Sequence, residues 1–595
     1  MDARQEYVIK TEHLTKVFQP KNGAPVTALA SLDMQVKKGV LSALIGPDGS
    51  GKTTLMRLVA GLMVPTEGTL TVLGKNVVDS PQAVQDELSY MPQKFGLYED
   101  LSVQENLDLY SDLHGIPKEI RPERFERLLK MTGLTPFTKR LAGKLSGGMK
   151  QKLGLACTLV RSPALLLLDE PTVGVDPLSR RELWEILKNL VENDPISILV
   201  NTSYMDEAEM CADVFIMNRG RILMQGAPGE VRALAENCCY SVSPPKNLPT
   251  RVLQSLLLDD TEHITDAVPD GGRVRFIKNG TEDSPVLSDF SLTAEAVPER
   301  LEDGFMLLLH KDMKENPDPS MPTAKMDGGI LRNQKYDTSR EEMPVDIEVK
   351  NLVRKFGDFT AVANTSFSVH RGEIFGLLGP NGAGKTTTFR MLCGLLPATS
   401  GYLNVAGVDL AESRTKARAN LGYVAQKFSL YGNLSVMENL RFFGGAYGLS
   451  GDTLKKRIEE VLDEFSLNGR ENDAAEALPG GYKQRLSMAA ALMHRPKILF
   501  LDEPTSGIDP LARRQFWRQI TDLSAQGTTI IITTHFMEEA EYCDRIMIQD
   551  QGRLFAIGSP ERIRDELGLK NAPMNEIFIT IVENGRKEGD HGKSS

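Results

Sequence analysis

The 595-residue sequence predicts an α/β protein made of two related modules in tandem, with a small α/β insert between them. Three observations support this. The phrase GPDGSGKT at 46–53 returns as GPNGAGKT at 379–386, each copy follows a short apolar run, and each precedes a helix-like stretch. The lysines of the two phrases, Lys52 and Lys385, are 385 − 52 = 333 residues apart. An offset of that length indicates repeated whole domains rather than solenoid units.

Other motifs repeat at the same offset of 333 residues: Gln93 with Gln426, Gly147 with Gly480, and Asp169 with Asp502. We therefore expect module one at about 1–235 and module two at about 346–563. A short repeat, LEDGFM from Leu301 and MNEIFI from Met574, closes each half.

The remaining segments are assigned by their composition. Residues 236–310 alternate strand-like and helix-like runs and predict a small accessory domain. Residues 311–345 hold four prolines and no sustained apolar period, which predicts a flexible linker. Residues 564–595 form a C-terminal tail, and we expect its polar end, from about Asn584, to be disordered.

The bulk composition limits the class of protein. A net charge of −11 does not favour nucleic acid as a partner, because phosphate neutralisation needs a basic face. The six cysteines form no CxxC pair and no signal-peptide pattern opens the sequence, so we expect a reducing cytoplasm. No apolar run approaches the roughly 18 to 20 residues of a membrane-crossing helix. We therefore expect any contact with a membrane to be indirect.

The repeated glycine-rich phrase predicts a P-loop that binds nucleotide phosphates. Glycines let successive backbone N–H groups turn toward the phosphates at a helix N-terminus. Lys52 and Lys385 are expected to reach the β- and γ-phosphates of ATP, and Thr53 and Thr386 to offer a hydroxyl to Mg²⁺. The full predicted sets are Gly46, Gly49, Gly51, Lys52, Thr53 and Thr54 in module one, and Gly379, Gly382, Gly384, Lys385, Thr386 and Thr387 in module two.

A buried strand ending in two acids follows in each module, as LLLLDE at 165–170 and ILFLDE at 498–503. A carboxylate at the C-terminal end of such a strand lies beside the P-loop. We expect Asp169 and Asp502 to hold the Mg²⁺ shell, and Glu170 and Glu503 to polarise the attacking water.

The phrases LSGGMKQK at 145–152 and LPGGYKQR at 478–485 place two glycines at the start of a helical stretch, a second anion-binding terminus in each module. With them the sequence resembles the ATP-binding-cassette (ABC) family. The resemblance implies P-loop NTPase domains with a helical subdomain each, and a signature that caps the ATP held by the other module. The residues concerned are Ser146, Gly147, Gly148, Gly480 and Gly481.

Further residues match the family one by one. Phe18 and Phe356 resemble the aromatic residue that stacks on adenine. Gln93 and Gln426 resemble the glutamine that contacts Mg²⁺ and senses the membrane partner. Asp176 and Asp509 resemble the aspartates that communicate between paired modules, and His535 resembles the switch histidine that contacts the γ-phosphate.

The two sites differ. Ser203 stands where module two has His535, and Pro479 stands where module one has Ser146. If the modules pair head to tail, both departures fall on the site of Lys52 and Glu170, so the site of Lys385 and Glu503 is expected to be the better hydrolase. The alternative is that Ser203 and Pro479 are unrelated, tolerated replacements.

The phrases LYEDLSVQENL and LYGNLSVMENL resemble bacterial drug-exporter ATPases of the ABC-2 class. That resemblance implies two separate membrane permease subunits as partners and a place on the cytoplasmic face of the inner membrane. Two alternatives stay open. One is the tandem ATPase of a sugar importer, and the other is a soluble ribosome-associated translation factor, which the proline-containing linker disfavours.

Overall fold

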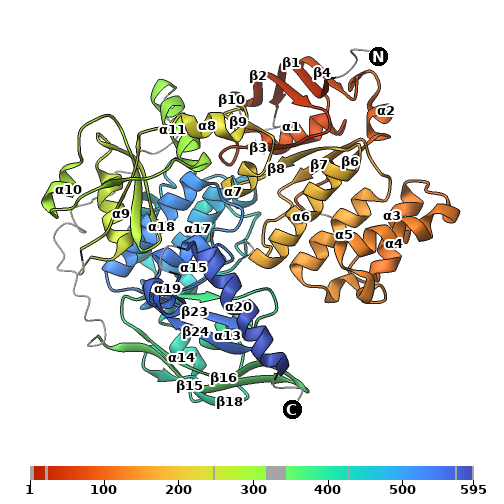
Figure 1. Ribbon diagram of the computed structural model, residues 1–595. Coiled ribbons are helices and arrows are strands. Elements are labelled where there is room, and N and C mark those ends of the chain that lie inside the picture. The colour runs from red at the N-terminus through yellow and green to blue at the C-terminus, as the bar shows by residue number, and fades with distance from the viewer. Residues whose placement is uncertain are drawn as a thin grey trace. The chain divides into compact units, whose positions relative to one another are not determined.

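The computed structural model describes residues 6–19, 25–94, 96–245, 248–316, 343–426, 428–569 and 572–591 (Figure 1). The chain divides into two compact units. Unit 1 comprises Met1–Glu236 and Glu299–Asp312, and unit 2 comprises Asn237–Pro298 and Met313–Ser595.

Unit 1 contains a six-stranded sheet in the order β10-β9-β3-β8-β7-β6. Strands β3, β7 and β8 are buried along their whole length, which explains their continuous apolar runs. Neighbouring strands of this sheet pair in parallel, except that the edge strand β10 is antiparallel to β9. The strands are β3 (Leu41–Ile45), β6 (Leu88–Met91), β7 (Leu165–Asp169), β8 (Ser197–Asn201), β9 (Asp213–Asn218) and β10 (Arg221–Gly226).

An antiparallel sheet in the order β2-β1-β4-β5 shares a hydrophobic core with this parallel sheet. Its strands are β1 (Tyr7–Phe18), β2 (Val26–Lys37), β4 (Glu67–Val72) and β5 (Lys75–Asn76). The helices of the module are α1 (Lys52–Val59), α2 (Pro81–Gln85), α3 (Val103–Leu113), α4 (Arg121–Thr132), α5 (Gly147–Leu159), α6 (Pro177–Asn193), α7 (Met205–Glu209) and α8 (Pro228–Ala233), with 3-10 turns at Lys118–Ile120, Thr135–Phe137 and Ala142–Lys144. Helices α3 and α4 both pack on α5 and form the helical subdomain.

Module two in unit 2 repeats this architecture with sheets β20-β21-β22-β17-β23-β24 and β16-β15-β18-β19. Its strands are β15 (Val345–Phe356), β16 (Phe359–His370), β17 (Ile374–Leu378), β18 (Ser400–Val405), β19 (Val408–Asp409), β20 (Leu421–Val424), β21 (Ile498–Asp502), β22 (Thr529–Thr533), β23 (Arg545–Asp550) and β24 (Arg553–Gly558). Its helices are α13 (Lys385–Leu392), α14 (Arg414–Arg418), α15 (Val436–Ala446), α16 (Gly451–Glu464), α17 (Gly480–Leu492), α18 (Pro510–Ala525), α19 (Pro560–Leu567) and α20 (Met574–His591), with 3-10 turns η5 (Ala475–Ala477) and η6 (Met537–Tyr542). The α/β class and its duplication are confirmed.

The stretch expected as one accessory domain, 236–310, divides between the two units. Its first part forms an antiparallel sheet in the order β12-β13-β11-β14. We call Asn237–Pro298 the small domain; it contains β11 (Cys239–Val242), α9 (Thr250–Asp259), β12 (Ile264–Asp270), β13 (Arg273–Lys278), α10 (Pro285–Asp289) and β14 (Glu295–Ala296), and it belongs to unit 2.

The second part is helix α11 (Leu301–Glu315), most of which belongs to unit 1. The helix lies so close to α8 that a Cβ on Gly304 would be 2.0 Å from the carbonyl oxygen of Val231. Asn218 of β9 donates a hydrogen bond to Asp312 at 2.7 Å. The apolar side of α11 therefore packs on module one instead of completing the small domain.

The expected linker and tail also differ from the structure. Helix α11 continues to Glu315 and β15 starts at Val345, while 317–342 lies outside the described residues. The disorder expected from Asn584 is wrong as far as His591, because helix α20 continues to that residue. Residues 592–595 lie outside the described part. In that part, no helix combines the length and apolar character that a membrane span requires.

Candidate active sites

The P-loops require glycine for a steric reason. Gly51 has φ +105°, and a Cβ there would be 2.4 Å from the carbonyl oxygen of Ala28. Gly384 has φ +100°, and its Cβ would be 2.4 Å from the carbonyl oxygen of Ala361. Any side chain would therefore push the loop away from the strand beside it. This fixes the turn through which each central strand enters its helix.

The predicted lysines and threonines occupy the first turn of α1 and α13. Lys52 is buried and donates hydrogen bonds to the carbonyls of Gly46 at 2.8 Å and Pro47 at 2.9 Å. Lys385 donates to the corresponding carbonyls of Gly379 and Pro380. Each lysine ammonium group is therefore bonded to backbone carbonyls of its own P-loop. The adjacent hydroxyls are those of Thr53 and Thr54 in module one and of Thr386 and Thr387 in module two.

Asp169 ends β7 beside the P-loop of module one, as predicted. Its carboxylate accepts hydrogen bonds from Asn201 Nδ2 at 2.5 Å, Tyr90 OH at 3.1 Å and Thr53 Oγ1 at 3.4 Å. Burial, followed by the nearby Asp169 charge, raises the pKa of Tyr90 to about 12, so this hydroxyl stays a donor. Tyr90 is not among the predicted site residues, although its counterpart Tyr423 repeats at the same offset of 333 residues.

Asp502 ends β21 in module two and accepts a hydrogen bond from Thr533 Oγ1 at 2.6 Å. Burial raises the pKa of Asp502, and the Thr533 hydroxyl opposes that shift. Thr533 occupies the place of Asn201, so the two aspartates are held by different neighbours. In the described part of the chain, no three His, Cys, Asp or Glu residues form a metal-binding group. One carboxylate and one hydroxyl in each module fit Mg²⁺, which is commonly held by one or two protein groups together with substrate phosphates.

The two candidate catalytic glutamates share an uncommon backbone conformation. Glu170 has φ 50° and Glu503 has φ 49°, a left-handed region that costs a non-glycine residue about 1–3 kcal/mol. Each carboxylate accepts a hydrogen bond from the predicted glutamine of its own module, Gln93 at 2.9 Å for Glu170 and Gln426 for Glu503. Glutamine and glutamate are therefore brought together in both modules.

The electrostatic setting is unusual at Glu170. Burial raises the pKa of Glu170 to about 7, the charges of Asp48 and Asp169 add to the shift, and the Lys52 charge opposes it. A carboxyl group with this pKa exchanges a proton near neutral pH, which suits a general base.

The switch position separates the two modules most clearly. His535 is 9% exposed, and its Nε2 lies 2.6 Å from Oε1 of Glu503. Ser203, in the same place of module one, is 3% exposed, and its hydroxyl has no hydrogen-bond partner among the described residues. Among the described residues, Glu503 of module two therefore contacts both Gln426 and His535, whereas Glu170 of module one has the Gln93 contact without an imidazole.

The signature helices differ at their first residue. Ser146 caps α5 by accepting a hydrogen bond from the Met149 N–H at 3.3 Å. Pro479 holds the same position before α17 and provides no side-chain cap. The paired glycines Gly147 and Gly148 begin α5, and Gly480 and Gly481 begin α17. The proline leaves the helix intact and removes a hydroxyl from its end.

The remaining predicted residues lie at strand and helix ends. Phe18 ends β1 with Lys16 Nζ 5.4 Å from its ring centroid, and Phe356 ends β15 and is 46% exposed. The side chains of Asp176 and Asp509 cap α6 and α18. Each carboxylate accepts a hydrogen bond from the backbone N–H of the residue three positions later in the sequence. The aspartates therefore have a structural role in addition to the predicted communication.

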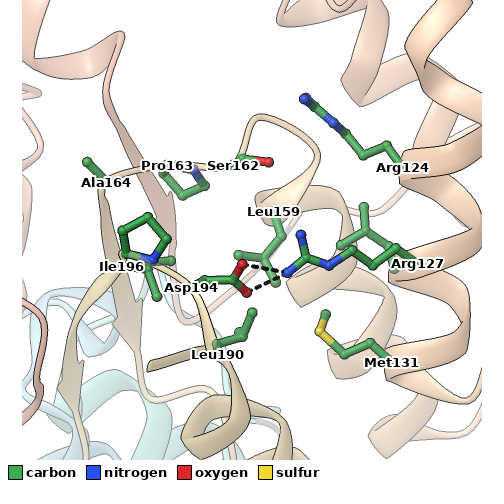
Figure 2. Close-up of a pocket in the computed structure, with 12 residues that line it drawn as sticks. Arg124, Arg127, Met131, Leu159, Ser162, Pro163, Ala164, Leu190, Asp194 and Ile196 are labelled. Carbon is green, nitrogen blue, oxygen red and sulfur yellow. Dashed lines mark hydrogen bonds and ion pairs between the residues drawn. The ribbon is translucent and has the colours of Figure 1, made fainter. Parts of the chain in front are cut away.

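A cavity of about 220 Å³ in unit 1 lies away from this chemistry (Figure 2). Its walls include Ala164, which precedes β7, and Ile196, which precedes β8, whereas Asp169 ends β7. Arg127 of α4 donates to both carboxylate oxygens of Asp194, at 2.7 and 2.5 Å. The cavity is thus at the opposite end of the strands from the P-loop.

Two P-loops, each beside an acidic strand end and followed in sequence by a glycine-rich helix start, define a tandem P-loop ATPase. The chain belongs to the ABC transporter family, whose model matches residues 29–173 and 362–506. This agrees with the family resemblance of the sequence.

Several known proteins are similar to the chain. It is 48% identical to the "Probable multidrug ABC transporter ATP-binding protein YbhF" of Escherichia coli (strain K12), over 98% of this chain and 99% of that protein. It is 42% identical to the "Linearmycin resistance ATP-binding protein LnrL" of Bacillus subtilis (strain 168), over 40% of this chain and 78% of that protein. A solved ATP-binding subunit of an ABC transporter is 32% identical, covering 40% of this chain and 99% of its own, with a TM-score of 0.38.

Proposed function

We propose that the chain powers export of drugs or other small molecules through two separate permease subunits of the ABC-2 type. Support comes from the similarity over nearly the whole length to a protein named as a probable multidrug transporter subunit. A shorter relative, LnrL, is named for resistance to linearmycin. The permeases would hold the chain on the cytoplasmic face of the inner membrane, with Gln93 and Gln426 as the residues that sense them.

The residues divide the work of hydrolysis within each module. Lys52 and Lys385 bind the β- and γ-phosphates, and Thr53 with Asp169 and Thr386 with Asp502 hold Mg²⁺. Bound Mg²⁺ supplies charge neutralisation for the triphosphate. Glu170 and Glu503 accept a proton from the attacking water, and the neighbouring glutamines orient these carboxylates.

The two modules of the chain pair head to tail in this proposal, so that each signature caps the nucleotide of the other module. Site one then combines Lys52, Glu170 and Ser203 with the Pro479 signature, and site two combines Lys385, Glu503 and His535 with the Ser146 signature.

The observation that carries this proposal is the position of Glu503, which accepts a hydrogen bond from Gln426 and lies 2.6 Å from the imidazole of His535. Module one has Ser203 in the place of that imidazole. Site two is therefore the main hydrolase, and site one binds ATP and turns it over slowly through Glu170.

Copurification tests the biological role. The tagged full-length chain is isolated from detergent-solubilised membranes, and a Glu503→Gln form serves as the matched control for ATP-dependent contacts. Two multispanning membrane proteins in the eluate are expected. Recovery of ribosomal subunits instead, with no membrane protein, would overturn the proposal in favour of a translation factor. Recovery of permeases together with a sugar-binding protein would indicate an importer.

A further inference from the structure

The small domain packs on module two, although module one precedes and follows it in the sequence. The chain leaves unit 1 after Glu236 and returns to it at Glu299. Within unit 2, helix α9 lies beside α18 (Figure 1). Both α9 and β12 also contact η6. Ala525, at the end of α18, packs against the apolar core of the small domain. This packing is therefore part of the folded unit.

Charged contacts fix this packing. Arg251 lies 2.5 Å from Asp544, and Asp266 lies 3.3 Å from Arg514. All four side chains are buried or nearly so. Three further contacts add to these: Asp259 with Arg518, the Gly272 N–H with Glu541 at 3.2 Å, and Arg251 with Ser524 at 3.4 Å. A buried ion pair has strict geometric demands, because each charge loses its water and depends on its partner.

Module one provides an internal comparison, because it keeps Arg181 in the place of Arg514 and Glu209 in the place of Glu541 but differs at other docking positions. Ala212 stands in the place of Asp544, and Glu185 stands in the place of Arg518. An equivalent ion pair is present in both modules but differs in exposure. In module one the side chains of Arg232 and Glu209 are 44% and 39% exposed, whereas in module two those of Arg564 and Glu541 are 2% and 6% exposed. The complete docking surface, with Asp544 and Arg518, is thus present in module two and only in part in module one.

The elements that the small domain contacts also hold the switch histidine. Helix α18 begins directly after Asp509, and η6 begins two residues after His535. Glu539 of η6 accepts a hydrogen bond from Thr534 Oγ1 at 2.6 Å. The guanidinium of Arg513 in α18 lies 4.1 Å from the ring centroid of Phe536. The residues on both sides of His535 are therefore anchored by η6 and α18.

A second connection runs to the P-loop strand. Asp544, the partner of Arg251, also accepts a hydrogen bond from the backbone N–H of Ile374 at 2.9 Å. Ile374 is the first residue of β17, which leads into the P-loop of module two. Asp544 thus links the small domain to the start of β17, the strand whose other end leads into the P-loop of module two.

We propose that the small domain is a positioning element for hydrolysis in module two, and that Arg251 and Asp266 are positioning residues that keep His535 in place against Glu503. The inference rests on the proposed function insofar as site two carries most of the ATPase activity. The small domain, which interrupts unit 1 in the sequence, would thus contribute to ATP hydrolysis in module two.

The test uses the full-length chain with the variants Asp266→Ala and Arg518→Glu. The second variant places the residue of module one in the docking surface. We expect kcat for ATP hydrolysis to fall about tenfold, the equivalent of one displaced hydrogen bond, while KM and the Kd for ATP stay unchanged. The matched control is Glu185→Arg, the reverse exchange at the exposed position of module one, which is expected to leave kcat unchanged.

Two further measurements separate positioning from general destabilisation. The double variant Asp266→Arg with Arg514→Asp exchanges the two charges and restores the ion pair between these positions. Its kcat is expected to recover most of the loss seen in Asp266→Ala. In a Glu503→Gln background, Asp266→Ala is expected to cause no further loss, because the activity that depends on His535 is already gone.

Unchanged kcat in both docking variants, or an equal loss in Glu185→Arg, would overturn the positioning role. So would a rise in KM alone, or a further tenfold loss in the Glu503→Gln background. The proposed inequality of the sites is judged separately, since it fails if Glu503→Gln alone leaves the ATPase activity intact.

Discussion

Replacing His535 with serine converts the switch of module two into that of module one. In the native chain, His535 Nε2 lies 2.6 Å from Glu503 Oε1 in a buried setting. His535→Ser leaves Glu503 bonded to Gln426 alone, as Glu170 is bonded to Gln93. A hydrogen bond to a charged group contributes about 1.5–3 kcal/mol, so the expected loss in kcat is about ten- to a hundredfold.

The assay is steady-state hydrolysis of Mg-ATP, with ATP binding measured separately by equilibrium titration. The matched control is Ser203→Ala, which removes a buried hydroxyl without a hydrogen-bond partner in the described structure. That variant should retain activity within about twofold. An equal loss from Ser203→Ala, or near-native activity of His535→Ser, would refute the reasoning.

Three other predictions concern stability and the signature helices. Glu170 has a pKa raised by burial to about 7 from 4.5, so its ionisation destabilises the fold as pH rises from about 4.5 to 7. Glu170→Gln should therefore stabilise the protein at pH 8 by up to about 3 kcal/mol and have no such effect below pH 4, measured by denaturant unfolding. Pro479→Ser should add a helix cap worth about 1 kcal/mol and, in a Glu503→Gln background, raise the residual ATPase activity; an unchanged rate would contradict the link between this residue and site one. Gly148→Ala should lower the melting temperature, because its Cβ would lie 2.4 Å from the Ser179 side chain, whereas the unobstructed Gly481→Ala should not.

The sequence was sufficient to predict the elements whose chemistry is local. A P-loop needs glycines at positions of positive φ, and the acidic strand ends follow buried apolar runs. Both features can therefore be recognised from residue types and their spacing in the sequence. The glutamines and His535 were found through the family resemblance, and the structure brings each glutamine to the glutamate of its own module.

Tertiary packing explains the predictions that failed. The prediction of one accessory domain at 236–310 rests on alternating strand-like and helix-like runs, yet α11 packs on module one. The repeat of LEDGFM and MNEIFI indicated that α11 closes a module in the way that α20 does. The polar end of α20 was expected to be disordered, but Arg586 pairs with Asp550 at 2.7 Å. No local signal in the sequence shows that the small domain would dock on module two.

The most direct test of unequal sites compares Glu503→Gln with Glu170→Gln in the steady-state ATPase assay, with both proteins shown to be folded and to bind ATP. The account predicts that Glu503→Gln abolishes most of the activity and that Glu170→Gln retains much of it. Equal losses in the two variants would contradict the account.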